Sequence, residues 1–145
     1  MMRKRIFRLT IFCLFVCTRL AFAQVVVIAH KAVPEDTLSQ ARLLDFYSGE
    51  IKAWGNRVPA VIFDLKPVNA IREAFYQLLG KTPSRMKSIW LKKMLMGEGD
   101  PPAALESEEE AVKKVAATKG ALGFVSKAKV TPEVKIIFVI EKKDK

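Results

Sequence analysis

The sequence has very few of the residues that build metal and disulfide sites. It contains two cysteines and one histidine among 145 residues. Cys13 and Cys17 both lie in the first 23 residues, which have the features of a removable targeting signal. His30 alone, without cysteine, cannot make a typical zinc site. The sequence therefore predicts neither a disulfide framework nor a metal centre in the mature chain.

Recognisable catalytic motifs are also missing. The sequence has no phosphate-cradling loop of the P-loop type and no serine in a nucleophile-elbow context. No spacing supports a catalytic triad through His30. Asp45, Glu50 and Asp64 are likewise not singled out by any spacing, so we expect a surface role for each. These absences favour a protein that is not an enzyme and that uses no cofactor.

Acidic residues are absent from the first 23 positions, which carry five basic residues. A basic start is followed by an apolar run over residues 9–17, and Ala21 and Ala23 are the small residues expected before a cleavage point. This order is typical of a secretory signal peptide over residues 1–23. The alternative is a membrane anchor, but Arg19 interrupts the run well short of the roughly 20 residues that span a bilayer. We therefore expect a periplasmic or secreted mature chain of residues 24–145.

The charge of the mature chain is modest. The whole chain has 25 Lys and Arg against 15 Asp and Glu, a formal charge of +10. Without the five basic residues of the signal, 20 basic residues face 15 acidic ones, which leaves +5. The lysines are interspersed with acidic residues, and the aromatic residues lie on the predicted core faces of helices. The pattern therefore does not predict a nucleic-acid partner.

Hydrophobic periodicity predicts one domain of alternating strands and helices. Short apolar runs predict strands over residues 25–29, 58–63, 121–125 and 134–140. Capping residues predict four helix starts; these are the Thr37/Gln40 box, Asn69, Thr82 with Pro83, and the Ser107/Glu110 box. We expect the segment over residues 97–102 to be a loop. The element order argues for an α/β fold with helices on a mixed, mostly parallel sheet.

Two side-chain patterns favour structural roles. Met86, Ile89, Trp90 and Met94 recur at helical spacing, which predicts a core-facing stripe. The three glutamates at 108–110 start a helix whose later positions carry lysines, and this order complements the helix dipole. We expect that helix to be solvated rather than metal-binding, because consecutive glutamates point around a helix.

Four segments taken together resemble the phosphate ABC transporter substrate-binding proteins of the periplasmic-binding-protein superfamily. More closely, they resemble short, single-lobe relatives of those proteins. The segments are Leu43–Trp54 (LLDFYSGEIKAW), Asn69–Tyr76 (NAIREAFY), residues 89–102 (IW…GEGDPP) and Gly120–Val125 (GALGFV). The resemblance implies a single periplasmic-binding-protein-like lobe over residues 24–145, matching the second of the two lobes that close on a ligand in full-length members.

The resemblance also implies a place for a ligand. The family's anion site in this lobe is a Gly-Ser-Gly-Thr-like turn that opens a helix, and residues 68–71 occupy those positions here. Backbone N–H groups at such a helix start favour an anion. Asn69 can still cap or donate, but Ala70 and Ile71 replace a glycine and the threonine. Lys66 and Arg72 are nearby cations that either compensate or are simply solvated.

Two functions follow from these observations. The first is an extracytoplasmic binding protein that takes inorganic phosphate or another oxyanion at residues 69–72, linked to ABC-type transport or sensing. The second is a non-catalytic interaction module that keeps the lobe fold without physiological ligand binding. A membrane transporter or another envelope protein is the expected partner in either case.

Overall fold

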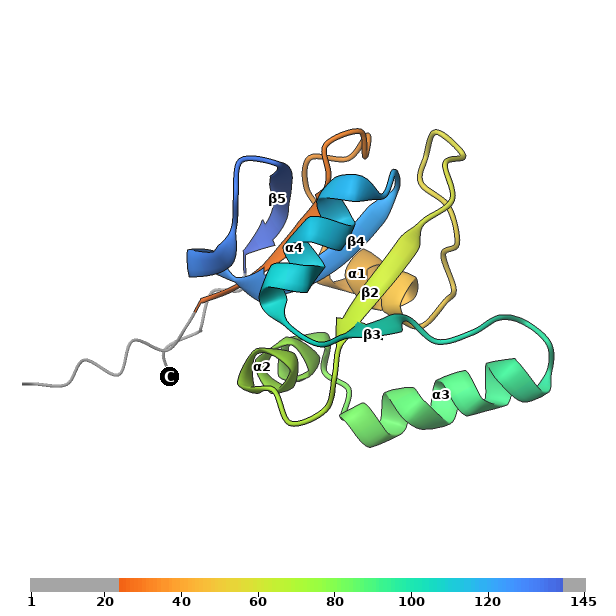
Figure 1. Cartoon of the computed structure of the whole chain (residues 1–145). Helices are drawn as coiled ribbons and strands as arrows, with labels where there is room; N and C mark the ends of the chain where they lie inside the picture. Colours follow the sequence, from red (N-terminus) through yellow and green to blue (C-terminus); the bar gives the residue numbers. More distant parts are fainter. Residues whose placement is uncertain (1–23, 140–145) are drawn as a thin grey trace, which may run out of the picture.

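The computed structural model describes residues 24–139. The predicted signal peptide, both cysteines and Ile140, the expected last residue of the final strand, lie outside these residues. Five strands form one mixed sheet in the order β3-β2-β4-β1-β5 (Figure 1). They are β1 (Val25–His30), β2 (Val61–Leu65), β3 (Ala103–Leu105), β4 (Ala121–Ser126) and β5 (Val134–Val139). The expected α/β fold with a mixed sheet is confirmed.

The strand pairings divide evenly between the two directions. Strand β2 pairs in parallel with β3 and with β4. Strand β1 pairs antiparallel with β4 and with β5. Two of the four strand pairings are therefore parallel, whereas the sequence pattern predicts a mostly parallel sheet. Of the three inner strands, β1 and β4 are buried along almost their whole length, which explains why their sequences are continuous apolar runs rather than alternating ones.

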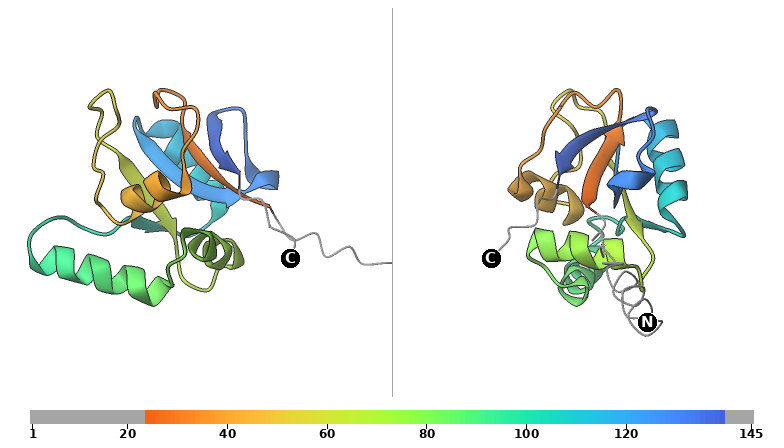
Figure 2. Two further views of the ribbon diagram at one scale, coloured as in Figure 1. Left: turned by 180° about the vertical axis from the view of Figure 1, so that it is seen from behind. Right: turned by 90° about the vertical axis from the view of Figure 1, so that its left-hand side faces the viewer.

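Helices cover both faces of this sheet. On β4, a Cβ at Gly123 would lie 3.1 Å from the Val115 side chain of α4 (Glu108–Ala117). The next residue, Phe124, stacks on Phe75 of α2 (Ala70–Leu79) with ring centroids 3.9 Å apart. Successive strand residues point to opposite faces, so α4 and α2 lie on opposite sides of the sheet. Figure 2 shows α1 (Gln40–Tyr47) on the side away from α4.

Three of the four predicted helix starts have the expected capping residue, but Glu110 accepts the N–H of Glu106 rather than that of Ser107 and so does not complete the predicted capping box. The side chains of Asn69, Thr82 and Ser107 each accept backbone N–H groups at the starts of α2, α3 (Pro83–Leu95) and α4. The fourth prediction is wrong, because Ser39 caps α1 instead of Thr37. The N–H of Leu38 donates to the carbonyl of Ile137 at 3.0 Å, which ties the residues before α1 to β5.

Two strand expectations also differ from the structure. Strand β2 begins at Val61 rather than at residue 58, and Pro59 instead forms an isolated antiparallel bridge with Ala53. Strand β3 was not predicted at all. It follows a loop rich in glycine and proline. Because it is only three residues long, its sequence has too few positions to show a strand period.

Helix α3 is only partly a core helix. Met86 is buried and Trp90 is half-buried, but Met94 is 44% exposed, so the prediction of a continuous core stripe is wrong at its C-terminal end. The ring of Trp90 packs on Gly49, where an added Cβ would lie 2.5 Å from the ring. The indole N–H of Trp90 donates to the carbonyl of Tyr47 at 2.9 Å. Figure 1 shows the rest of α3 lying outside the sheet layer.

Candidate functional site

The predicted ligand-binding residues lie where β2 ends and α2 begins. Strand β2 ends at Leu65, and α2 starts five residues later at Ala70. In sheets with parallel strands, ligands commonly bind beyond the carboxyl ends of the strands, where helix N-termini meet. The β2–α2 connection forms one wall of a groove of about 1100 Å³, and part of α3 forms the other.

Asn69 already caps the helix start at which an anion was expected. Its Oδ1 atom accepts the N–H of Ile71 at 2.9 Å and the N–H of Arg72 at 3.2 Å. Its own carbonyl accepts the N–H of Glu73 at 3.1 Å. Two of the N–H groups that an anion would use are thus bound to the Asn69 side chain, which is what an N-cap does in any helix.

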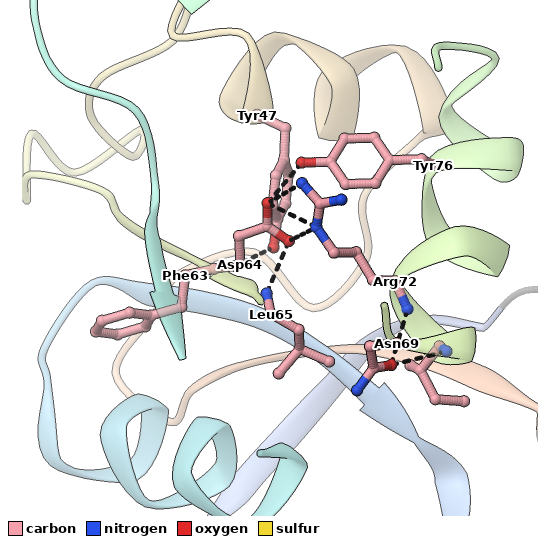
Figure 3. Close-up of polar contacts among 8 residues, drawn as sticks. Tyr47, Phe63, Asp64, Leu65, Asn69, Arg72 and Tyr76 are labelled. Atoms are coloured by element: carbon pink, nitrogen blue, oxygen red, sulfur yellow. Dashed lines mark hydrogen bonds and ion pairs between the residues drawn. The ribbon is translucent and has the colours of Figure 1, made fainter. Parts of the chain in front are cut away.

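Arg72 is held by a carboxylate from β2 (Figure 3). Its Nε lies 3.2 Å from Oδ1 of Asp64, and its Nη2 lies 3.2 Å from Oδ2. The Tyr76 hydroxyl donates to the same Oδ2 at 2.7 Å, and the N–H of Leu65 donates to Oδ1 at 2.7 Å. Asp64 is only 8% exposed, so the expected surface role for this residue is wrong.

These three side chains form a compact cluster, which we call the Asp64 cluster: Asp64, Arg72 and Tyr76. The guanidinium carbon of Arg72 lies 4.7 Å from the centroid of the Tyr76 ring. Burial, followed by the negative charge of Asp64, raises the pKa of the Tyr76 hydroxyl, so that this hydroxyl stays protonated and donates. The cluster pairs one positive charge with one negative charge and leaves little net attraction for an incoming anion.

Lys66 is the other cation expected near the site. Its ammonium group forms an ion pair with Glu106, and both side chains are more than half exposed. Exposed ion pairs of this kind are weak and exchange readily with solvent. Lys66 is therefore available to an anion only in competition with a neighbouring acidic residue.

The groove beside these residues is lined mainly by apolar side chains. Leu65, Pro67 and Val68 contribute from the β2–α2 connection, and Trp90 and Leu91 contribute from α3. Val68 is fully exposed and has a φ of 66°. That backbone region is unfavourable for a β-branched residue. Val68 occupies the first position of the glycine-containing turn to which residues 68–71 were matched.

The structure brings Asn69, Ala70, Ile71 and Arg72 together at one helix start, with Lys66 on the approach to it. Sequence reasoning missed Asp64, which neutralises Arg72, and Tyr76, which donates a hydrogen bond to Asp64. The signal for Tyr76 was present, since it lies four residues after Arg72 and hence on the same side of the helix. The sequence contains no such signal for Asp64, because the position of an acidic residue near the end of a strand does not show which way its side chain points.

Other kinds of site are not visible in the described part of the chain. Within residues 24–139, no group of three or more His, Cys, Asp or Glu side chains is arranged to hold a metal ion. Nδ1 of His30 accepts the N–H of Ala32 at 3.0 Å in a surface turn. None of the helices over the same residues is both long enough and apolar enough to cross a membrane.

Comparison with solved structures identifies the fold. An ABC-type phosphate transport receptor from Vibrio cholerae matches with a TM-score of 0.64 and 20% identity, over 79% of this chain and 45% of that one. A protein from Clostridium perfringens, described as a phosphate ABC transporter substrate-binding protein with bound phosphate, matches with a TM-score of 0.66 and 19% identity, over 79% and 44%. PstS from Borrelia burgdorferi matches with a TM-score of 0.60 and 12% identity, over 79% and 46%.

These matches confirm the resemblance at the level of the fold. The chain has the α/β fold found in part of each of these substrate-binding proteins, and it spans less than half of their length. No family model matches the sequence. No curated protein matches it either.

Proposed function

We propose that this chain is a non-enzymatic lobe of the substrate-binding-protein fold that works outside the cytoplasmic membrane through a protein partner, without tight binding of a small ligand. A membrane transporter or another envelope protein is the proposed class of partner. The observation that carries this proposal is the pairing of Arg72 with Asp64. A cation that is neutralised within its own chain contributes little to the capture of a free anion.

The apolar lining of the groove supports the same proposal. A small oxyanion needs several convergent hydrogen-bond donors, whereas most of the groove wall offers carbon atoms. The groove is also open, so an anion bound there would keep much of its contact with water, which weakens electrostatic attraction. Oxyanion binding by this chain alone is therefore expected to be weak.

The second candidate function is oxyanion binding at residues 69–72, with inorganic phosphate as the first ligand to test. Two observations favour it. The α2 N-terminus opens on the groove, and a protein with the same fold is described with bound phosphate. In this case Lys66 would leave Glu106 and the amides near Asn69 would contact the anion, and the chain would serve ABC-type transport or sensing.

An amide NMR titration of residues 24–145 with phosphate separates the two functions, with chloride at matched ionic strength as the control. We expect no saturable shifts at residues 69–72 below millimolar phosphate. Saturable shifts confined to those amides at micromolar phosphate would refute the first proposal and support the second.

Two variants make the titration more decisive. Asp64→Asn removes the charge that neutralises Arg72, so it should tighten phosphate binding if Arg72 is otherwise competent. Asn69→Asp places a negative charge at the helix start and should abolish any binding there. Asn56→Asp is the matched control, because it makes the same charge change in a turn where Asn56 accepts only the N–H of Val58. An effect of Asn56→Asp equal to that of Asn69→Asp would show that net charge, and not the site, controls binding.

A further inference from the structure

The outer side of α3 exposes a row of large apolar side chains. Leu91 is 51% exposed, Leu95 is 81% exposed and Met96, the residue that ends the helix, is 60% exposed. Leu91 and Leu95 are four residues apart and so lie on one side of the helix. Large apolar side chains gathered on one surface of a soluble protein commonly mark a binding surface.

The opposite side of α3 anchors the helix to the body of the protein. Met86 is buried, and Trp90 is fixed by its hydrogen bond to Tyr47. Lys93 forms an ion pair with Glu50 at 2.9 Å and a longer one with Glu98 at 3.6 Å. These anchors determine which side of α3 faces away from the sheet. Figures 1 and 2 show the helix projecting beyond the rest of the fold.

Positive charge flanks the apolar row on both sides. Residues 81–97 contain five basic residues and no acidic one. Of these five basic residues, only Lys93 forms an ion pair within residues 24–139. With 100° between successive helix residues, Lys87 lies on one side of the Leu91–Leu95 row and Lys92 lies on the other. Both lysines are exposed.

We propose that this side of α3 binds the surface of an anionic phospholipid bilayer. We call it the α3 surface, and it consists of Arg85, Lys87, Leu91, Lys92, Leu95 and Met96. Helices that lie at a membrane surface place apolar side chains among the acyl chains and direct lysines to the headgroups on either side. Lys87 and Leu91 also line the groove, so the α3 surface and the groove share these two residues, but the inference does not rest on the proposed function.

Charge and shape favour a bilayer over other occupants. A second copy of the chain docked through the same surface would bring two sets of basic residues together, which is unfavourable. The part of the α3 surface outside the groove, with Lys92, Leu95 and Met96, is a projecting helix side and so suits a flat surface, whereas an acidic peptide would be held better by a concave one. A bilayer supplies anionic headgroups for the basic side chains and, directly beneath them, an apolar interior for Leu91, Leu95 and Met96.

Such binding is expected to be reversible and sensitive to salt. Each lysine near an anionic surface contributes about a fivefold gain in affinity at physiological ionic strength. The apolar side chains of Leu91, Leu95 and Met96 add to the affinity by inserting shallowly into the bilayer. Without anionic headgroups, as in phosphatidylcholine alone, this insertion should give only weak binding. High salt shortens the range of the attraction and should release the protein.

Vesicle co-sedimentation of residues 24–145, which contain every described element, tests the proposal. We expect binding to vesicles of equal parts phosphatidylglycerol and phosphatidylcholine, release by high salt, and little binding to phosphatidylcholine alone. Lys87→Gln with Lys92→Gln should weaken binding about tenfold or more. Leu95→Gln should weaken it at constant charge.

The matched control changes two lysines elsewhere. Lys113→Gln with Lys114→Gln removes the same charge from exposed positions of α4, and its affinity should stay within about twofold of the unmodified chain. Equal losses in the two double variants would overturn the proposal by showing attraction through net charge alone. Unchanged binding of Leu95→Gln would also overturn it. Failure to bind any vesicle would assign the α3 surface to an acidic protein instead.

Discussion

Removing both partners of the Asp64–Arg72 ion pair should destabilise the protein by less than the sum of the two single removals. Asp64 is 8% exposed and the Arg72 side chain is 14% exposed, so the ion pair is largely shielded from water. Asp64→Asn keeps the shape but loses the charge-assisted bonds to Arg72, at a cost of about 2 kcal/mol. Arg72→Met leaves a buried carboxylate with two neutral donors, at a cost of about 3 kcal/mol.

The double variant is the informative measurement. If the two side chains acted independently, its cost would be about 5 kcal/mol, the sum of the two single changes. We expect about 3 kcal/mol, because neither variant residue leaves a buried charge without its partner. The difference corresponds to a coupling energy of about 2 kcal/mol.

Urea unfolding of the four proteins, followed by circular dichroism at neutral pH, gives these free energies from the midpoints and slopes. Tyr76→Phe in the Arg72→Met background serves as a further check, because it removes one of the two remaining donors to Asp64 and should cost more than it does in the unmodified chain. Additivity of Asp64→Asn and Arg72→Met within about 0.5 kcal/mol would refute the picture of a coupled, shielded pair.

Two further predictions concern the attachment of α3 and the alkaline limit of stability. Gly49→Ala should lower the free energy of unfolding by about 2–4 kcal/mol, because Gly49 has a φ of 73° and the added Cβ meets the ring of Trp90. Gly97→Ala is the control: Gly97 has a φ of 70° but open space around it, so this change should cost only about 1 kcal/mol in the same urea assay. The raised pKa of Tyr76 means that the unfolded chain loses this proton first as pH rises, so the contribution of Tyr76 to stability should be constant below about pH 10 and fall above it. Burial also raises the pKa of the Tyr47 hydroxyl, which adds to the alkaline loss. A Tyr76→Phe variant with the same alkaline loss would contradict this assignment.

The sequence predicted the helices best where capping residues mark their starts. Asn69, Thr82 and Ser107 all act as expected, since a side chain that satisfies nearby N–H groups is a purely local device. The prediction based on Thr37 was wrong because the chain before α1 is held by β5, nearly 100 residues later in the sequence. A local pattern contains no information about such a contact.

The candidate site was located from the sequence, but its charge was not. Residues 69–72 were identified through a resemblance, and their helix-start geometry follows from Asn69. Whether Arg72 is free or neutralised depends on the direction in which Asp64 points at the end of β2. That direction is set by the pairing of β2 between β3 and β4, which is a tertiary property.

The sequence by itself determined the α/β class, most element positions and the helix caps, because periodicity and capping act over a few residues. The tertiary structure alone decided the strand order, the addition of β3 at the sheet edge and the outward exposure of Leu91 and Leu95. It also decided that Asp64 is buried against Arg72, eight residues away across the β2–α2 turn. These features depend on which surfaces meet after the chain has folded, and free energies of contact between distant segments leave no regular pattern in the sequence.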